Sequence, residues 1–273
     1  MASPAVDGTA HGDFTSVSSG TATLTTANAG DAIFALVVWG GNFTQGATTY
    51  GATSVSSISS THTTGWTKVA SGNANGTGAP TSPATGAPGY AELWQGLAAA
   101  ALTAEVITAQ MSGASNNNVD SGQLMVFGVS SAVAYTALAQ DPNALSLATA
   151  VSFDSHAPGP GPNALAIVNI TTTNAADLLL EFFCNINNNV GQGIPAGFTT
   201  LSTHSNAAGN FWATITSGYE QVAAAQNNVA ITTSNTIGFT EGWVYIVLAV
   251  QNGPGRVNPP PATFPVASTT NVH

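Results

Sequence analysis

The sequence contains very few charged residues, and basic residues are almost absent. Its 273 residues include only Lys68 and Arg256 as Lys or Arg, against twelve Asp and Glu, so the formal net charge is −10. Binding to nucleic acid or to anionic membranes needs clustered basic side chains, so the composition argues against both partners. With 5% charged residues, the surface must be hydrated by Thr, Ser, Asn and Gly, which suit strands and turns better than helices.

The chain also lacks the marks of a disulfide-bonded, secreted or membrane-inserted protein. Cys184 is the only cysteine and lies in the apolar run Leu178–Cys184, where we expect a buried thiol that acts as a small hydrophobic group. Residues 1–13 have neither the basic nor the apolar region of a secretory signal peptide. No apolar run approaches the roughly 20 residues of a membrane helix. We therefore expect synthesis in the cytoplasm without a signal peptide, and no membrane insertion.

The apolar residues that are present fall in short runs of strand length, bounded by Gly, Asn, Ser and Pro clusters. Some runs alternate with polar residues, as in a sheet with one buried face, and others are apolar throughout, as in a central strand. Leu97–Val106 is also compatible with a turn or two of helix. The pattern predicts strands over Thr21–Thr25, Ala32–Trp39, Trp66–Ala70, Ala91–Trp94, Glu105–Gln110, Gln123–Val129, Ala164–Ile170, Leu178–Asn185, Phe198–Thr203, Phe211–Tyr219, Asn228–Thr233 and Trp243–Gln251.

The order of these runs repeats once along the chain. Thr25–Asp31 (TTANAGD) and Thr171–Asp177 (TTTNAAD) agree at five of seven positions, and each precedes an apolar run. Gly65–Ser71 (GWTKVAS) likewise matches Gly197–Thr203 (GFTTLST). The offset between matched runs falls from 146 to 120 residues along the chain. The first half therefore carries longer loops, where binding functions usually evolve; they lie mainly in Gly40–Thr64 and Ser71–Gly89.

These observations predict an all-β fold, an antiparallel, jelly-roll-like β-sandwich built from two pseudo-repeated halves. The sandwich covers residues 1–252, with repeats at about 15–135 and 160–252 and a linker at about 138–163. Each half alone has few strands and many small residues. We therefore expect the halves to interleave into one sandwich of about ten strands, with two small sandwiches as the alternative. The Pro-rich residues 253–273 cannot form a central strand and should be an extended C-terminal arm.

A set of packing residues recurs in a fixed order along the chain. In the second half these residues are Asp177-Leu178-Leu179-Leu180, Pro195-Ala196-Gly197-Phe198-Thr199, Tyr219, Ala223–Ala225 and Gly242-Trp243-Val244, with first-half copies Gly30-Asp31-Ala32, Gly65-Trp66-Thr67 and Leu93-Trp94. This set resembles a family of jelly-roll proteins found among phage and prophage virion genes and in bacterial surface proteins. The resemblance covers roughly residues 15 to 251 and includes no catalytic motif. It implies a virion component such as a head decoration, fibre or tail protein.

The acidic residues give no pattern typical of an active site. A glycosidase needs two positioned carboxylates, but Asp31 and Asp177 lie at turns, where a carboxylate often caps the backbone. Glu181 is unusual because it interrupts the apolar run LLLEFFC, and it should point outward or toward a neighbouring subunit. The other glutamates in or beside strands are Glu92, Glu105, Glu220 and Glu241.

Metal, nucleophile and phosphate motifs are absent as well. No histidine has zinc-ligand spacing to another histidine or to Cys184; the histidines are His11, His62, His156, His204 and His273. Asn116–Asn118 with Asp120, or Asn185–Asn189, could offer oxygen ligands to calcium, but both fit turns better. The chain has no G-x-S-x-G elbow and no phosphate-loop lysine. We therefore predict no catalytic residue, no metal site and no cofactor.

The sequence predicts a non-enzymatic bacteriophage structural protein, a capsid decoration, head fibre or tail component, that is made in the host cytoplasm and assembles with copies of itself and other virion proteins. The predicted partner-binding residues lie in the arm: Pro259, Pro260, Pro261, Phe264 and Pro265. One alternative is a glycan-binding adhesion module on the particle or cell surface, which would need two aromatic residues on one outer face; the tryptophan candidates are Trp39, Trp66, Trp94, Trp212 and Trp243. A jelly-roll hydrolase is the less favoured alternative.

Overall fold

The computed structural model confirms an all-β protein. It describes residues 3–45, 47–73, 89–113, 115–130, 140–148, 167–172, 175–186, 193–209, 212–234 and 242–251. Within these segments every regular element is a strand, and no helix is present that could cross a membrane. All strand pairs are antiparallel.

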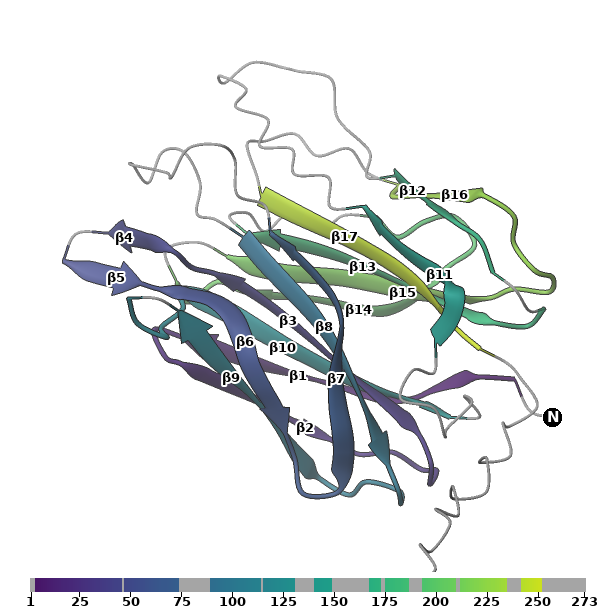
Figure 1. The fold of residues 1–273 in the computed structure, drawn as a ribbon, viewed down its shortest axis with the longest axis horizontal. Coiled ribbons are helices and arrows are strands. Elements are labelled where there is room, and N and C mark those ends of the chain that lie inside the picture. Colours follow the sequence, from purple (N-terminus) through teal and green to yellow (C-terminus); the bar gives the residue numbers. More distant parts are fainter. Residues whose placement is uncertain are drawn as a thin grey trace, which may run out of the picture.

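Two five-stranded sheets form the centre of the molecule, each from one half of the chain (Figure 1). The first sheet has the order β1-β10-β3-β8-β7, and its strands are β1 (Ala5–Thr15), β10 (Ser121–Ser130), β3 (Ala32–Gly40), β8 (Gly89–Ala98) and β7 (Thr63–Asn73). The second has the order β11-β17-β13-β15-β14, and its strands are β11 (Gln140–Ala148), β17 (Gly242–Val250), β13 (Leu178–Ile186), β15 (Ala213–Gln221) and β14 (Thr199–Asn206). Matched in chain order, the two sheets have the same strand order.

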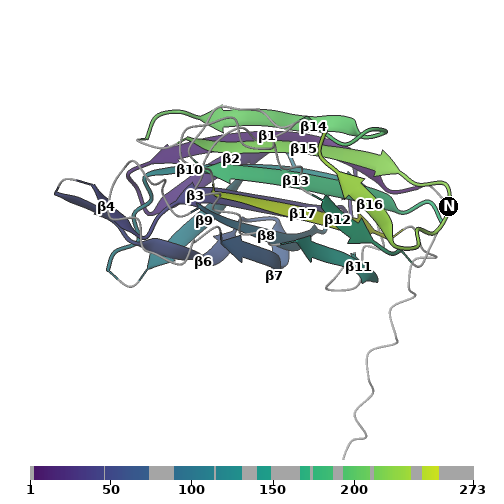
Figure 2. The ribbon, with the colours of Figure 1, turned by 90° about the horizontal axis from the view of Figure 1, so that it is seen from above.

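Smaller sheets cover the outer faces of the two large ones. The first is covered by β2-β9-β6, formed by β2 (Ser19–Leu24), β9 (Glu105–Gly113) and β6 (Ala52–Ser59). The second is covered by the pair β12 (Ile167–Ile170) and β16 (Val229–Thr232), seen at the upper right of Figure 1. A hairpin of β4 (Phe43–Gln45) and β5 (Thr48–Tyr50) extends from the first half. The molecule therefore has four β-layers, and Figure 2, which looks down on them, shows the strands of each large sheet side by side.

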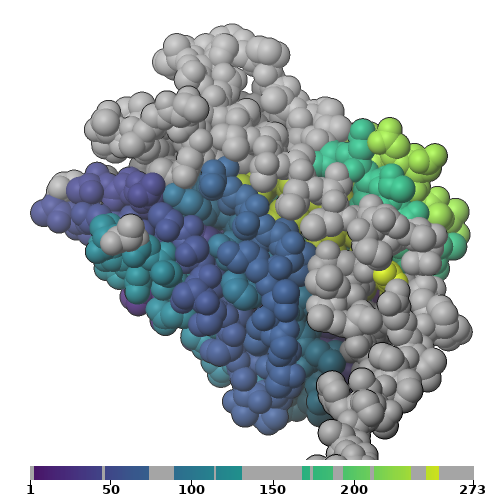
Figure 3. Space-filling view, in the orientation of Figure 1, coloured from purple at the N-terminus to yellow at the C-terminus, as the bar shows by residue number. Residues whose placement is uncertain are grey.

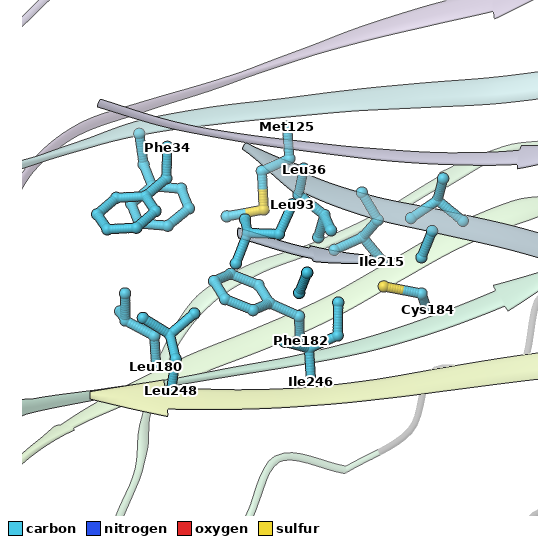
Figure 4. Packing of buried hydrophobic residues seen from close by; sticks show 14 of the residues in the cluster. Phe34, Leu36, Leu93, Met125, Leu180, Phe182, Cys184, Ile215, Ile246 and Leu248 are labelled. Atoms are coloured by element: carbon cyan, nitrogen blue, oxygen red, sulfur yellow. The ribbon is translucent and has the colours of Figure 1, made fainter. Parts of the chain in front are cut away.

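Three hydrophobic cores lie between the four layers. The central core joins the two large sheets, and in Figure 4 Phe34 and Met125 of one sheet face Leu180, Phe182 and Leu248 of the other. Alternate residues of the same strands point into the outer cores. Because β3 and β13 are buried on both faces along their whole length, they need apolar residues at nearly every position.

All twelve predicted strands are present, but the halves do not interleave. The ten central strands form one sandwich, yet in the described part of the chain each sheet contains strands of one half only. The short helix considered at Leu97–Val106 is wrong, because β8 ends at Ala98 and β9 begins at Glu105, with a turn between them. Leu102 in that turn is 1% exposed, so its burial outweighs local helix propensity.

Five further strands, β1, β4, β5, β6 and β11, were not predicted, and three of them have a clear physical reason. β6 lies in Gly40–Thr64, which was expected to be a loop; bulges after Ala52 and Val55 give its buried residues a spacing of three instead of two. β11 lies in the predicted linker and contains Pro142 beside a register shift at the sheet edge. β1 is an edge strand whose residues are mostly half-exposed, so it carries little apolar signal.

Candidate functional site

The repeated TT-x-N-A-x-D motif closes a turn in each half. Thr26 and Leu102 exchange two hydrogen bonds of 3.0 Å, and Ala104 N donates to Thr25 Oγ1 at 3.0 Å. Matched residues of the second half make matched bonds: Thr172 with Gln226 at 3.0 and 2.8 Å, and Asn228 N with Thr171 Oγ1 at 3.1 Å. Ala104 and Asn228 also share a positive φ, 49° and 52°. The motif therefore serves folding.

The first aspartate of this motif, Asp31, is not a turn cap of the predicted kind, because neither of its carboxylate oxygens has a hydrogen-bond partner. Asp31 and Asp177 are both 0% exposed, and the turn after β2 is capped by Asp7, whose carboxylate accepts from Ala27 N and Asn28 N at 2.9–3.0 Å. Burial, together with the nearby carboxyl group of Asp7 and its charge, raises the pKa of Asp31 to about 7. A carboxyl pair of this type could exchange protons with a substrate, but Asp31 is fully buried, so a substrate has no access to its carboxyl group.

A serine, two histidines and an aspartate meet where the edge strands β1 and β14 approach each other. Ser202 Oγ and His11 Nε2 are 2.6 Å apart, the rings of His11 and His204 stack at 4.8 Å, and His204 Nε2 lies 3.2 Å from Asp13. Burial, followed by the charge of His204, lowers the pKa of His11 to about 4, so its neutral ring can accept from Ser202. The His-x-Asp and Ser-x-His spacings were visible in the sequence, but the contact between β1 and β14 was not.

This cluster lacks the connectivity of a catalytic triad. In a triad the acid orients the same histidine that activates the serine. Here Asp13 contacts His204, while His11 Nδ1 is buried without a hydrogen-bond partner. Ser202 is also 9% exposed, so a substrate could hardly reach it. The cluster therefore connects the two halves and gives no sign of nucleophilic chemistry.

Glu181 points neither to solvent nor to a subunit surface, contrary to the expectation from sequence. It is 1% exposed on the outer side of β13, and neither carboxylate oxygen has a hydrogen-bond partner. Burial raises the pKa of Glu181 well above its ordinary value, so it folds as a neutral acid. Burial and the nearby Glu181 also raise the pKa of Cys184 and of Tyr245, and the prediction of a buried thiol is confirmed.

Several other polar residues that stood out in the sequence make structural contacts. Glu105 accepts from His62 N at 2.7 Å and contacts His62 Nδ1 at 2.7 Å, and Glu92 binds Lys68 Nζ at 2.9 Å. Asn116 bonds the backbone of the β4–β6 region and of its own turn, as predicted for a turn. Among the described residues, no three His, Cys, Asp or Glu side chains could together hold a metal ion. His156, Asn187–Asn189, Glu241 and His273 lie outside those residues.

A groove of about 470 Å³ opens on the outer side of the second half, beside β16. The matched place in the first half holds the His62–Glu105 contact, and Ile194 and Val229 stand at the corresponding positions of the second half. Apolar residues dominate the groove, and Glu220 is its only charged lining residue. The lining consists of Leu179, Pro195, Ala196, Phe198, Glu220, Gln221, Val222, Ala223, Gln226, Val229, Ala230, Ile231 and Thr232.

A smaller hollow of about 240 Å³ lies on the first half, in the region of β6 to β8 that Figure 3 shows from the front (blue). It is lined by Trp39, Thr53, Ser71, Gly72, Asn73, Tyr90 and Glu92. Trp39 is 0% exposed and stacks on Tyr90 at 5.2 Å. Trp66, Trp94 and Trp212 are half-buried, and the side chain of Trp243 is not described. The described tryptophans therefore do not form a fully exposed platform.

The predicted partner-binding residues Pro259, Pro260, Pro261, Phe264 and Pro265 lie outside the described residues. The described chain instead reveals the groove, which no sequence signal indicated. Comparisons of the chain with protein-family models, with curated proteins and with solved structures found no match.

Proposed function

We propose that this protein is a non-enzymatic structural component of a bacteriophage particle, which acts by assembly with copies of itself and with other virion proteins. The supporting observation is that the second sheet reaches the same five-strand order as the first without any residue after Gln251. The Pro-rich arm is therefore not needed to complete the sandwich and is available to a neighbour. The family resemblance and the scarcity of Lys and Arg support the same role.

The strand order supports the jelly-roll part of this proposal. In the first half, β1-β10-β3-β8 and β2-β9-β6 lie in two packed sheets, and this order supports a jelly roll, a fold common in viral capsids. The second half repeats β11-β17-β13-β15 and β12-β16. We take the two halves to be a duplicated unit, joined through the central core.

The experiment that tests the assembly role removes the arm. Deletion of residues 253–273 should abolish incorporation into particles, because Pro259, Pro260, Pro261, Phe264 and Pro265 would no longer reach a neighbour. The circular dichroism spectrum should keep its β signature, since no described strand is lost. Phe264→Ala is the finer variant and should reduce incorporation in the full-length chain. Normal incorporation of the deletion variant, measured by mass spectrometry of purified particles, contradicts the arm's role.

The hollow beside Trp39 favours glycan binding as the second candidate function. Short polar side chains around stacked aromatic rings are suited to sugar hydroxyls, and here Thr53, Ser71 and Asn73 surround Trp39 and Tyr90. A glycan array with the native protein and with Asn73→Ala tests it; Trp39 is a poor target, because its Nε1 donates to Ala52 O within the fold. The hollow beside Trp39 and the groove beside β16 are each lined by one carboxylate, Glu92 and Glu220. A glycosidase needs two carboxylates, so hydrolysis is the weakest candidate.

A further inference from the structure

The groove beside β16 has an apolar floor and a polar rim with one charge. Leu179, Phe198, Val222 and Ile231 belong to the outer core of the second half and also line the groove. Val229 on its wall is 38% exposed, unusually open for an apolar side chain of this molecule. The floor residues are already buried, so Val229 is the large apolar side chain that a docked peptide would remove from water.

Glu220 on the rim is available for a partner. Its side chain is half-buried and has no hydrogen bond or ion pair in the described structure. It lies over Gly197, where an added Cβ would come within 3.3 Å of Glu220 Oε1, and the φ of Gly197 is +92°. Glycine at this position therefore leaves room for the carboxylate at the groove.

The chain leaves the second sheet next to this groove. Ala249 pairs with Leu179, and Leu179 pairs with Glu220, so these residues form one row across β17, β13 and β15. Because neighbouring strands are about 4.8 Å apart, Ala249 and Glu220 are separated by about 10 Å. β17 ends at Val250, one residue after this row. The first residues of the arm, Gly253–Asn258, which we call its root, therefore begin within reach of the groove.

The negative charge of Glu220 indicates which part of the arm would occupy the groove, because a basic residue can pair with it. Lys68 already binds Glu92 at 2.9 Å and lies over the Trp94 ring at 5.5 Å, so Arg256 is the one basic residue left in the chain. It follows Gln251 by five residues, a distance of at most about 17 Å in extended chain. Val257 comes next and is apolar, and Gly253 and Gly255 allow the chain to turn back.

We propose that residues Gly253–Asn258 of the same chain occupy the groove, with Arg256 paired to Glu220 and Val257 on the apolar floor. The short connection from Gln251 gives this segment a high effective concentration at its own groove. This contact does not depend on a role in virions, because it concerns only the origin of the arm.

Trypsin offers a direct test, since the chain has only two sites for it, Lys68-Val69 and Arg256-Val257. We expect cleavage after Arg256 in the native full-length protein to be at least about tenfold slower than in a synthetic peptide of residues 251–262, because only the undocked population is cut. Glu220→Gln should bring the rate close to that of the peptide. Asp13→Asn, which removes a carboxylate near β14, is the matched control and should leave the rate unchanged. Cleavage after Lys68 in β7 reports unfolding in the same digest.

Three results would overturn the proposal. Cleavage of the native protein as fast as the peptide would show that the root is undocked. Slow cleavage that Glu220→Gln does not change would exclude the Arg256–Glu220 pair. Protection that disappears on dilution would show that the groove takes the arm of a second copy. Failure of the deletion experiment on particles would leave all three readouts unaffected, so the two proposals can fail separately.

Discussion

The two halves of the molecule share their central sheets and differ in their outer layers. Both large sheets have the same strand order, and both contribute almost only apolar residues to the core between them. In the described part of the chain, the outer layer of the first half has three strands, whereas that of the second has two. The difference follows from chain length, because β4, β5 and β6 lie between β3 and β7, and only residues 187–198 lie between β13 and β14.

A matched row across the two sheets shows how this difference changes side chains. In the first half Ala35 pairs with Trp94 and Val126, and in the second Glu181 pairs with Gly218 and Val247. The large side chain of this row is Trp94 on β8 in the first half and Glu181 on β13 in the second. A Cβ at Gly218 would lie 3.1 Å from Glu181 Oε1. Ala35 and Glu181 both point to the outer side of their sheets, so at this row the two halves differ in polarity in their outer layers.

The largest expected effect tests whether the halves unfold as one unit. Phe182→Ala removes a fully buried ring that packs at 5.6 Å from Phe127 of the other sheet, and Leu36→Ala changes the matched position in the first half. Each should lower the free energy of unfolding by about 2–5 kcal/mol. Urea unfolding should show one transition for both variants, and hydrogen exchange should accelerate in both sheets. Two separate transitions, with only the mutated half affected, would contradict a shared core.

The sequence predicted the strands that build the central layers, because burial on two faces demands apolar runs such as Ala32–Trp39. It could not show that the halves keep separate sheets, since both arrangements bury the same runs. The falling offset between the halves was visible, but it was interpreted as longer loops. Part of that extra chain is β6. Its bulges break the two-residue alternation of buried and exposed side chains, so the sequence indicates a loop where this outer strand lies.

The second expected effect depends on pH and on Glu181. Because burial raises its pKa in the folded state, the folded protein keeps a proton that the unfolded chain releases above its ordinary pKa of 4.5. Stability therefore falls as the pH rises from about 4.5 to the folded pKa, by about 1.4 kcal/mol per pH unit. Glu181→Gln removes this contribution. The difference in unfolding free energy between the variant and the native protein should grow with pH over this window, and a constant difference from pH 5 to 8 would contradict a neutral Glu181.

The candidate site was less predictable than the fold. Glu181 stood out in the sequence, but its environment depends on Gly218 and Tyr245 from neighbouring strands. The groove depends on residues between β13 and β14 together with β16, and no local pattern connects them. Glu220 and Arg256 were noted only as two charges in a chain with few of them. Pairing partners far apart in the sequence become visible only once the strand register is known.

The smallest expected effect concerns one pair of matched hydrogen bonds, one in each half. Thr25 Oγ1 accepts from Ala104 N at 3.0 Å, and Thr171 Oγ1 accepts from Asn228 N at 3.1 Å. Thr25→Val and Thr171→Val each remove one bond with little change in shape, so each should cost about 0.5–1.5 kcal/mol. If the halves form one cooperative unit, the two losses should be equal within error and additive in the double variant, since the sites share no partner. Unequal losses in urea unfolding would show that the turns, although alike in geometry, support halves of different local stability.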